Sequence, residues 1–124
     1  MLAHVSLQCA DPAESRAFYA AVLAPLGGQA LLVYGDHVGF GRQGEGPTFW
    51  IGPVNTPGGP HDDVHLAFVA RTRAEVDAFV EVARARGAEV LHEAKEWWYR
   101  PGYYGGFVRD PDGNNVEAVH LPAP

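Results

Sequence analysis

The sequence predicts an α+β fold made of two repeated βαβββ modules, and three observations support this prediction. The two halves of the 124-residue chain superpose at one constant offset, which places His4 on His65. Each half reads as a strand, a capped helix and three further strands, as in a duplicated unit. A stretch rich in proline and glycine separates the halves. We therefore expect a single domain over 1–124, divided into module one at 1–53, a linker at 54–60 and module two at 61–124.

The first half opens with alternating polar and apolar residues over 4–9, which predicts a strand with Val5, Leu7 and Cys9 on one face. The opposite face then carries three polar side chains, namely His4, Ser6 and Gln8. Asp11 is a typical helix N-cap with proline next to it, and the helix is expected to end at Gly27. Three antiparallel strands should follow, at 30–34, 37–42 and 48–52.

The second half repeats this order. Residues 64–69 alternate so that His65, Ala67 and Val69 share one face of a strand. Thr72 and the glutamate three residues later have the spacing of a capping box, and Gly87 ends the predicted helix. The remaining strand patterns lie at 89–92, 106–109 and 115–120.

The last two strands are joined by the turn Pro111-Asp112-Gly113-Asn114, whose residue types favour a tight turn. The turn fixes the register, and the register decides which way Glu117 points. If Val116 and Ala118 face the helix, Glu117 shares the other face with Val119. A carboxylate in the middle of an apolar strand is costly unless a positive group meets it.

Composition excludes several classes of partner. The formal charge of −6 and the absence of a Lys/Arg cluster argue against a nucleic-acid partner. The sequence contains no leader-like segment and no long apolar run, so we expect no membrane partner and a cytoplasmic location. The single cysteine, Cys9, lies in an apolar strand and is expected to be a buried, inert thiol.

The repeat places His4 and His65 at equivalent positions, and Glu117 lies on a third strand. All three side chains are predicted to face the same concave side of the sheet. Two imidazoles and one carboxylate can hold Fe, Mn, Ni, Co or Zn with positions left open for substrate. We therefore predict a divalent metal site at these residues, with the identity of the metal left open.

The opening strand His-Val-x-Leu, the second strand His-Leu-Ala-Phe and the closing Asp-Pro-Asp-Gly-Asn-Asn-x-Glu resemble the vicinal oxygen chelate superfamily, also called the glyoxalase/bleomycin-resistance/dioxygenase group. The resemblance covers essentially the whole chain. It implies two βαβββ modules that form a cup-shaped mixed sheet with helices on the outer face, usually in a homodimer. It also implies that His4, His65 and Glu117 match the metal ligands of the family.

The resemblance implies an enzyme that chelates two vicinal oxygens of a small substrate, through glyoxalase-like lyase or isomerase chemistry or through dioxygenase chemistry. Glyoxalase I members have a further acidic ligand on the last strand of the first module, and residues 48–51 contain no acid. Two alternatives stay open. One is a non-catalytic small-molecule or drug-binding protein of the bleomycin-resistance type, and the other is a purely structural partner module.

A loop rich in large aromatic residues precedes the last two strands. It is expected to form a rim for an apolar or aromatic substrate, or a dimer interface. Tyr103 or Tyr104 is a candidate catalytic proton donor. The predicted substrate pocket comprises Ser6, Gln8, Trp50, Ala67, Trp97, Trp98, Tyr99 and Val119.

Overall fold

Two copies of a βαβββ unit make up the chain in the computed structural model, which describes residues 1–54 and 64–122. The predicted α+β fold and its internal repeat are confirmed. The expected linker at 54–60 lies, apart from its first residue, outside the described residues. The first unit consists of β1 (Val5–Cys9), α1 (Pro12–Leu23), the short 3-10 helix η1 (Ala24–Leu26), β2 (Gly28–Tyr34), β3 (His37–Arg42) and β4 (Phe49–Pro53). The second consists of β5 (His65–Val69), α2 (Arg73–Ala85), β6 (Val90–Glu96), β7 (Tyr104–Arg109) and β8 (Asn115–His120).

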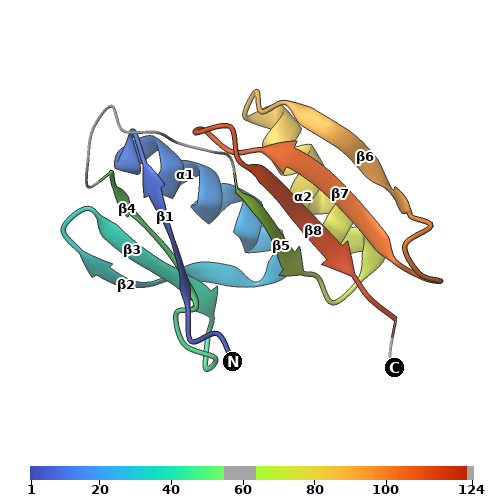
Figure 1. The fold of residues 1–124 in the computed structure, drawn as a ribbon, viewed down its shortest axis with the longest axis horizontal. Coiled ribbons are helices and arrows are strands. Elements are labelled where there is room, and N and C mark those ends of the chain that lie inside the picture. The colour runs from blue at the N-terminus through green and yellow to red at the C-terminus, as the bar shows by residue number, and fades with distance from the viewer. Residues whose placement is uncertain (55–63, 123–124) are drawn as a thin grey trace.

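The strands form two four-stranded mixed sheets, one in each module, with the orders β1-β4-β3-β2 and β5-β8-β7-β6. In each sheet the first strand of the module runs parallel to its neighbour, and the remaining pairs are antiparallel. Figure 1 shows the two sheets side by side, with α1 and α2 behind them and in contact with each other. One face of each sheet therefore packs on helices, and we call the opposite face its open face.

Both long helices begin at the side chains that the sequence indicated. The Asp11 carboxylate accepts a hydrogen bond from the backbone N–H of Glu14 at 3.1 Å, and the Thr72 hydroxyl accepts one from the backbone N–H of Glu75 at 3.1 Å. Each cap satisfies a backbone donor that the first turn of a helix leaves without an intrahelical partner. The same chemistry thus starts the helix in both modules.

The first helix ends earlier than the sequence analysis expected. Regular α-helix stops at Leu23, and the 3-10 turn Ala24–Leu26 follows because Pro25 has no N–H to continue the helical bonding. Gly27 then takes a left-handed conformation at φ 81° and donates its N–H to the carbonyl of Ala24. No helix in the two described ranges is long and apolar enough to cross a membrane.

One apolar core joins the two modules. The ring of Phe49 on β4 meets the ring of Phe68 on β5 edge-on, with centroids 5.0 Å apart, and Tyr19 on α1 lies 4.7 Å from Phe49. Cys9 is fully buried in this core, as expected, and burial raises the pKa of its thiol to about 11. The thiol therefore stays protonated and inert at neutral pH.

The closing turn also attaches the second module to the first. Asp110 is 5% exposed, and its carboxylate accepts hydrogen bonds from the Tyr19 hydroxyl at 2.6 Å and from the Asn114 amide at 2.9 Å. It also accepts from the backbone N–H groups of Asp112 and Asn114. Burial and the neighbouring Asp110 carboxylate raise the pKa of Tyr19 far above its usual range. Tyr19 is therefore a permanent donor to this carboxylate.

Asp112 adds a second link from the same turn. Its carboxylate accepts from the backbone N–H of Ala10 at 2.9 Å and from the Ser15 hydroxyl at 3.4 Å. Both partners lie in the first module, at the junction of β1 and α1. The turn that the sequence predicted only as a register-setting element is thus also a polar latch between the modules.

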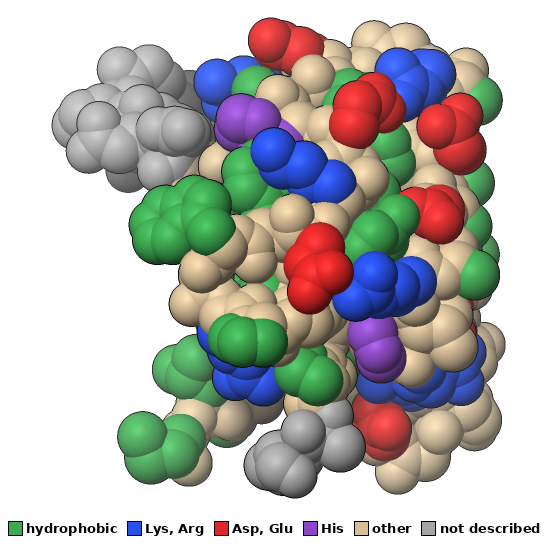
Figure 2. Space-filling view, turned by 90° about the vertical axis from the view of Figure 1, so that its right-hand side faces the viewer, with side chains coloured by type: hydrophobic (Ala, Val, Ile, Leu, Met, Phe, Trp, Pro, Cys, Tyr) green, Lys and Arg blue, Asp and Glu red, His purple; other side chains and the backbone are tan. Residues whose placement is uncertain are grey.

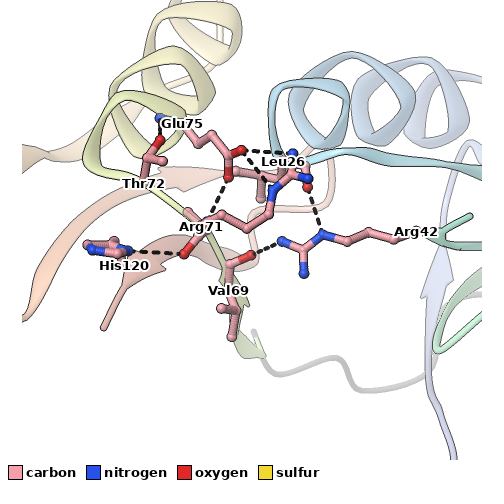
Figure 3. A network of polar contacts seen from close by, with 8 residues as sticks. Leu26, Arg42, Val69, Arg71, Thr72, Glu75 and His120 are labelled. Carbon is pink, nitrogen blue, oxygen red and sulfur yellow. Dashed lines mark hydrogen bonds and ion pairs between the residues drawn. The ribbon is translucent and has the colours of Figure 1, made fainter. Parts of the chain in front are cut away.

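A second polar network crosses the opposite end of the seam between the modules (Figure 3). The Arg42 guanidinium, on β3, donates to the carbonyl of Leu26 at 2.9 Å and to the carbonyl of Val69, at the end of β5, at 2.7 Å. Nearby, Arg71 donates to Glu75 at 2.9 Å. Because Arg42 bonds to a carbonyl in each module, it fixes how the two modules meet.

The outer side of the second module carries several ion pairs. Figure 2 shows acidic and basic side chains interspersed with apolar ones over this side of the molecule. Arg84 on α2 pairs with Glu81 and with Glu93 on β6, and Arg73 pairs with Glu96 at 3.4 Å. Charged side chains beside an edge strand disfavour the addition of a further strand. The edge strand β6 is therefore poorly suited to pairing with another strand.

Removing the buried carboxylate of the latch should destabilise the whole fold. We expect Asp110→Ala to lower the free energy of unfolding by about 3 kcal/mol, because several donors, among them the buried Tyr19 hydroxyl, lose their acceptor. Urea denaturation followed by circular dichroism measures the change. The control is Asp36→Ala, at the exposed turn between β2 and β3, which should change stability by no more than about 0.5 kcal/mol. Equal effects of the two variants would contradict the latch.

Loss of the Arg42 guanidinium should weaken the seam. We expect Arg42→Met to lower the free energy of unfolding by roughly 1 to 2 kcal/mol, because two carbonyls lose a charged donor while the aliphatic stem is kept. Arg16→Met, on the exposed side of α1, is the matched control and should be nearly neutral. Thermal unfolding of both variants under one set of conditions decides the point.

Candidate functional site

The site is built on the open face of the second sheet. Val116 and Ala118 are fully buried in the core, so the alternation of β8 turns Glu117 to the open face, as the sequence predicted. Glu117 lies on β8, which is the middle one of three neighbouring strands. Its register partners are Ala67 on β5 and Phe107 on β7. The carboxylate therefore sits at the centre of this face.

Glu117 is a buried acid in contact with an exposed histidine. Its side chain is only 1% exposed, whereas that of His65 is 51% exposed, and the His65 Nε2 lies 3.1 Å from the Glu117 Oε1. Burial raises the pKa of Glu117, while the contacts with Tyr103 and His65 act in the opposite direction. The sequence predicted that this acid needs a positive partner, and His65 is the ion-pair partner that the structure records for it.

The two candidate tyrosines point to opposite faces of the sheet. The Tyr103 hydroxyl donates a hydrogen bond to the Glu117 Oε2. The Tyr104 hydroxyl instead donates to Asp77 on α2 at 2.6 Å, and the Arg73 guanidinium lies over its ring. Tyr103 thus belongs to the group around Glu117, and Tyr104 belongs to the helix-covered face.

Part of the aromatic loop forms a wall beside Glu117. Trp97 stacks on Tyr99 with centroids 5.6 Å apart and planes 5° apart, and Tyr99 meets Tyr103 edge-on at 5.0 Å. Trp97 also contacts Phe107, a register partner of Glu117, at 5.4 Å, and its Nε1 donates to the carbonyl of Gly105. The wall is therefore attached to the sheet by packing and by a hydrogen bond.

Trp98 differs from its neighbours in the loop. It is 86% exposed, and its ring contact is with Tyr99 at 4.8 Å. Of the other predicted pocket residues in this module, Ala67 and Val119 lie on the open face, the first paired with Glu117 and the second with Gly105.

The open face of the first sheet carries a separate aromatic surface. Trp50 on β4 stacks on Tyr34 with centroids 6.2 Å apart and planes 17° apart. Gly39 allows this position, because a Cβ there would lie 2.7 Å from the Trp50 ring. Ser6 is the register partner of Trp50 on β1. Tyr34 was not among the residues predicted to line the pocket, although its strand pattern and aromatic type could have indicated it.

The polar residues of β1, and His4 just before it, lie on this same face. His4, Ser6 and Gln8 are exposed, while Leu7 and Cys9 are buried, which confirms the predicted alternation. His4 directly precedes β1 and therefore lies beside the sheet of the first module. Glu117 and His65 belong to the sheet of the second.

The three predicted ligands do not meet within one chain. Residues 1–54 and 64–122 contain no group of three His, Cys, Asp or Glu side chains that could hold a metal ion. His65 and Glu117 do come together, at 3.1 Å. The metal site at His4, His65 and Glu117 stays a prediction. Two of its three predicted ligands, His65 and Glu117, lie next to each other in one chain.

Asn115 is a polar residue of this face that the sequence analysis missed. It is the register partner of His65 and lies two residues before Glu117, so it shares the open face. Its buried side-chain oxygen has no hydrogen-bond partner among the described residues. A buried acceptor without a donor is rare, and it commonly marks a place for a water, an ion or a ligand.

A pocket of about 160 Å³ opens elsewhere, at the seam between the modules. Its lining includes Phe40, Arg42, Glu45 and Phe68, and it includes none of the residues predicted to bind substrate. This pocket therefore lies apart from the predicted site residues.

Comparison with known proteins agrees with the architecture. The model of the Glyoxalase/Bleomycin resistance protein/Dioxygenase superfamily matches residues 1–118. The chain belongs to this superfamily. A search of curated proteins found no match.

Solved structures of similar fold span nearly the whole chain. A glyoxalase/bleomycin resistance protein from Albidiferax ferrireducens T118 is 28% identical, with a TM-score of 0.78, 95% of this chain covered and 97% of that one. A lactoylglutathione lyase from Agrobacterium tumefaciens is 27% identical, with a TM-score of 0.66 and coverage of 94% and 90%. A glyoxalase/bleomycin resistance protein/dioxygenase family enzyme from Burkholderia phytofirmans PsJN, at 20% identity, a TM-score of 0.75 and 98% coverage of both chains, shares the fold.

Proposed function

We propose that the protein is a divalent-metal-dependent enzyme that chelates two adjacent oxygens of a small apolar or aromatic substrate. The observation that carries this proposal is the buried Glu117 carboxylate, which faces an exposed imidazole on the open side of its sheet. A carboxylate this deeply buried is costly unless positive charge meets it, and a divalent cation held beside His65 would supply that charge. The unpartnered Asn115 oxygen on the same face also favours a polar occupant.

We further propose that His4 of a second copy of the chain completes the ligand set in a homodimer. The first and second sheets lie side by side in one chain (Figure 1), and His4 does not join His65 and Glu117 there. Exposed apolar side chains in both modules favour association, among them Leu32, Tyr34, Val69, Trp98 and Tyr99. A twofold axis that sets the first sheet of each copy against the second sheet of the other would build two equal sites.

In this proposal each residue of the site has a role in binding either the metal or the substrate. His65 and Glu117, with His4 of the partner subunit, would hold the cation, which supplies Lewis-acid stabilisation of charge on the substrate oxygens. Trp97 and Tyr99 would bind the apolar part of the substrate and exclude water. Trp50 and Tyr34 of the partner subunit would face them across the interface.

The reaction class follows from family membership and from the ligand count. The likeness to a lactoylglutathione lyase supports lyase or isomerase chemistry. The absence of an acid on β4 (Phe49–Pro53) argues for three protein ligands in place of the four of glyoxalase I. Three-ligand sites with open positions also suit dioxygenase chemistry when the metal is iron.

The second candidate function is non-catalytic binding of an aromatic compound. Two stacked pairs favour it, Tyr34 with Trp50 and Trp97 with Tyr99, because both present large apolar rings on open faces. A sequestering protein needs no metal, so the metal content separates the two functions. A purely structural partner module would instead require a different chain over these faces, and a self-contained homodimer would contradict it.

The decisive measurement is the metal content of the protein purified anaerobically without chelator. We expect near-stoichiometric Fe, Mn, Ni, Co or Zn in the wild type and its loss in Glu117→Gln, because the substitution removes a charged ligand. Glu81→Gln, on the exposed side of α2, is the matched control and should keep the metal. A wild type without metal that also gains no stability from added divalent ions would leave the binding function.

Mixing two defective variants tests where His4 acts. We expect His4→Ala and Glu117→Gln each to lose the metal when the variant is measured by itself. Subunit exchange between them should restore one intact site per mixed dimer, or about a quarter of the wild-type sites in an equal mixture. A site contained in one chain predicts no recovery, so recovery separates the two arrangements. Analytical ultracentrifugation checks that the mixed species is a dimer.

A further inference from the structure

We propose that Tyr103 is a positioning residue: it holds the Glu117 carboxylate toward His65 and links that carboxylate to the aromatic wall. The inference rests on the proposed metal site for its functional meaning, whereas the arrangement itself is independent of any metal. Tyr103 would orient Glu117 through the hydrogen bond that the Tyr103 hydroxyl donates to the Glu117 Oε2.

The two carboxylate oxygens of Glu117 have different partners. Oε1 meets the His65 Nε2 at 3.1 Å, and Oε2 accepts the Tyr103 hydroxyl. With one partner on each oxygen, the plane of the carboxylate is fixed. Without the hydroxyl, Oε2 would lose the hydrogen bond that the structure gives it, and the carboxylate could rotate away from His65. Outer hydrogen bonds of this kind commonly orient metal-binding side chains.

Gly105 makes room for this contact. A Cβ at position 105 would lie 2.9 Å from the Glu117 Oε2 and 3.3 Å from the Tyr103 ring. Any side chain there would have to displace the carboxylate or the ring. The absence of a Cβ thus lets both groups lie together against the backbone of β7.

Tyr103 is also tied into the aromatic loop. Its backbone N–H donates to the carbonyl of Arg100 at 3.1 Å, and its carbonyl accepts from the N–H of Trp97 at 2.8 Å. Its ring meets Tyr99, which stacks on Trp97. A substrate that presses on Trp97 or Tyr99 would therefore act on the tyrosine that holds Glu117. The wall and the carboxylate form one connected unit.

The adjacent tyrosines provide a matched pair of variants. Tyr103→Phe removes only the hydroxyl that reaches Glu117, and Tyr104→Phe removes only the hydroxyl that reaches Asp77 on the helix side. Two readouts are measured for each: the ring NMR signals of His65 in metal-free protein, and the affinity and visible spectrum of added Co²⁺. Thermal unfolding confirms that both variants fold.

We expect Tyr103→Phe to shift the His65 ring signals, to weaken Co²⁺ binding about tenfold and to change the Co²⁺ spectrum, while Tyr104→Phe leaves all three as in the wild type. Gly105→Ala keeps the hydroxyl but crowds the contact, and it should shift the His65 signals too. Unchanged His65 signals in Tyr103→Phe, or equal shifts in Tyr104→Phe, would overturn the inference. If the wild type binds no Co²⁺, the metal function fails and the His65 signals alone decide the role of Tyr103.

Discussion

The hydrogen bonds accepted by the buried Asp110 carboxylate are the interactions on which the rest of the structure depends. Through the Tyr19 hydroxyl it attaches the closing turn to α1, and through the amides of Asp112 and Asn114 it shapes the turn itself. The turn sets the register of β8 against β7, and that register turns Glu117 away from the core. A structural carboxylate in the seam thus determines where the functional carboxylate points.

The two buried acids illustrate how environment separates structure from chemistry. Asp110 is saturated by tyrosine, amide and backbone donors, all of which lie in the protein interior or in the turn. Glu117 is bonded to one tyrosine and to one imidazole that is half exposed. Burial raises the pKa of Glu117. An acid that is costly to bury and only partly satisfied is the kind that a functional site retains.

The sequence predicted the elements and faces of the fold and the meeting of His65 with Glu117, but not how the tyrosines and His4 are placed around them. The local signals in the sequence were each confirmed by the structure. They are the helix caps at Asp11 and Thr72, the turn before β8, and the alternation of side chains around Glu117. The orientations of Tyr103 and Tyr104 depend on where β7 begins, which was predicted two residues too late. Whether His4 reaches Glu117 depends on how the modules pack and on how many chains take part, and neither is encoded in local periodicity.

The packing of the helices explains why one chain holds only part of the proposed site. Because α1 and α2 contact each other behind both sheets, the sheets lie side by side, and their open faces do not close on one another (Figure 1). The ion pairs along α2 and β6 leave the outer edge poorly suited to pairing with another strand. The aromatic rings of the two modules remain on the open faces. A second copy placed across these faces would bury both ring sets and bring His4 to Glu117, so assembly and metal binding would depend on one interface.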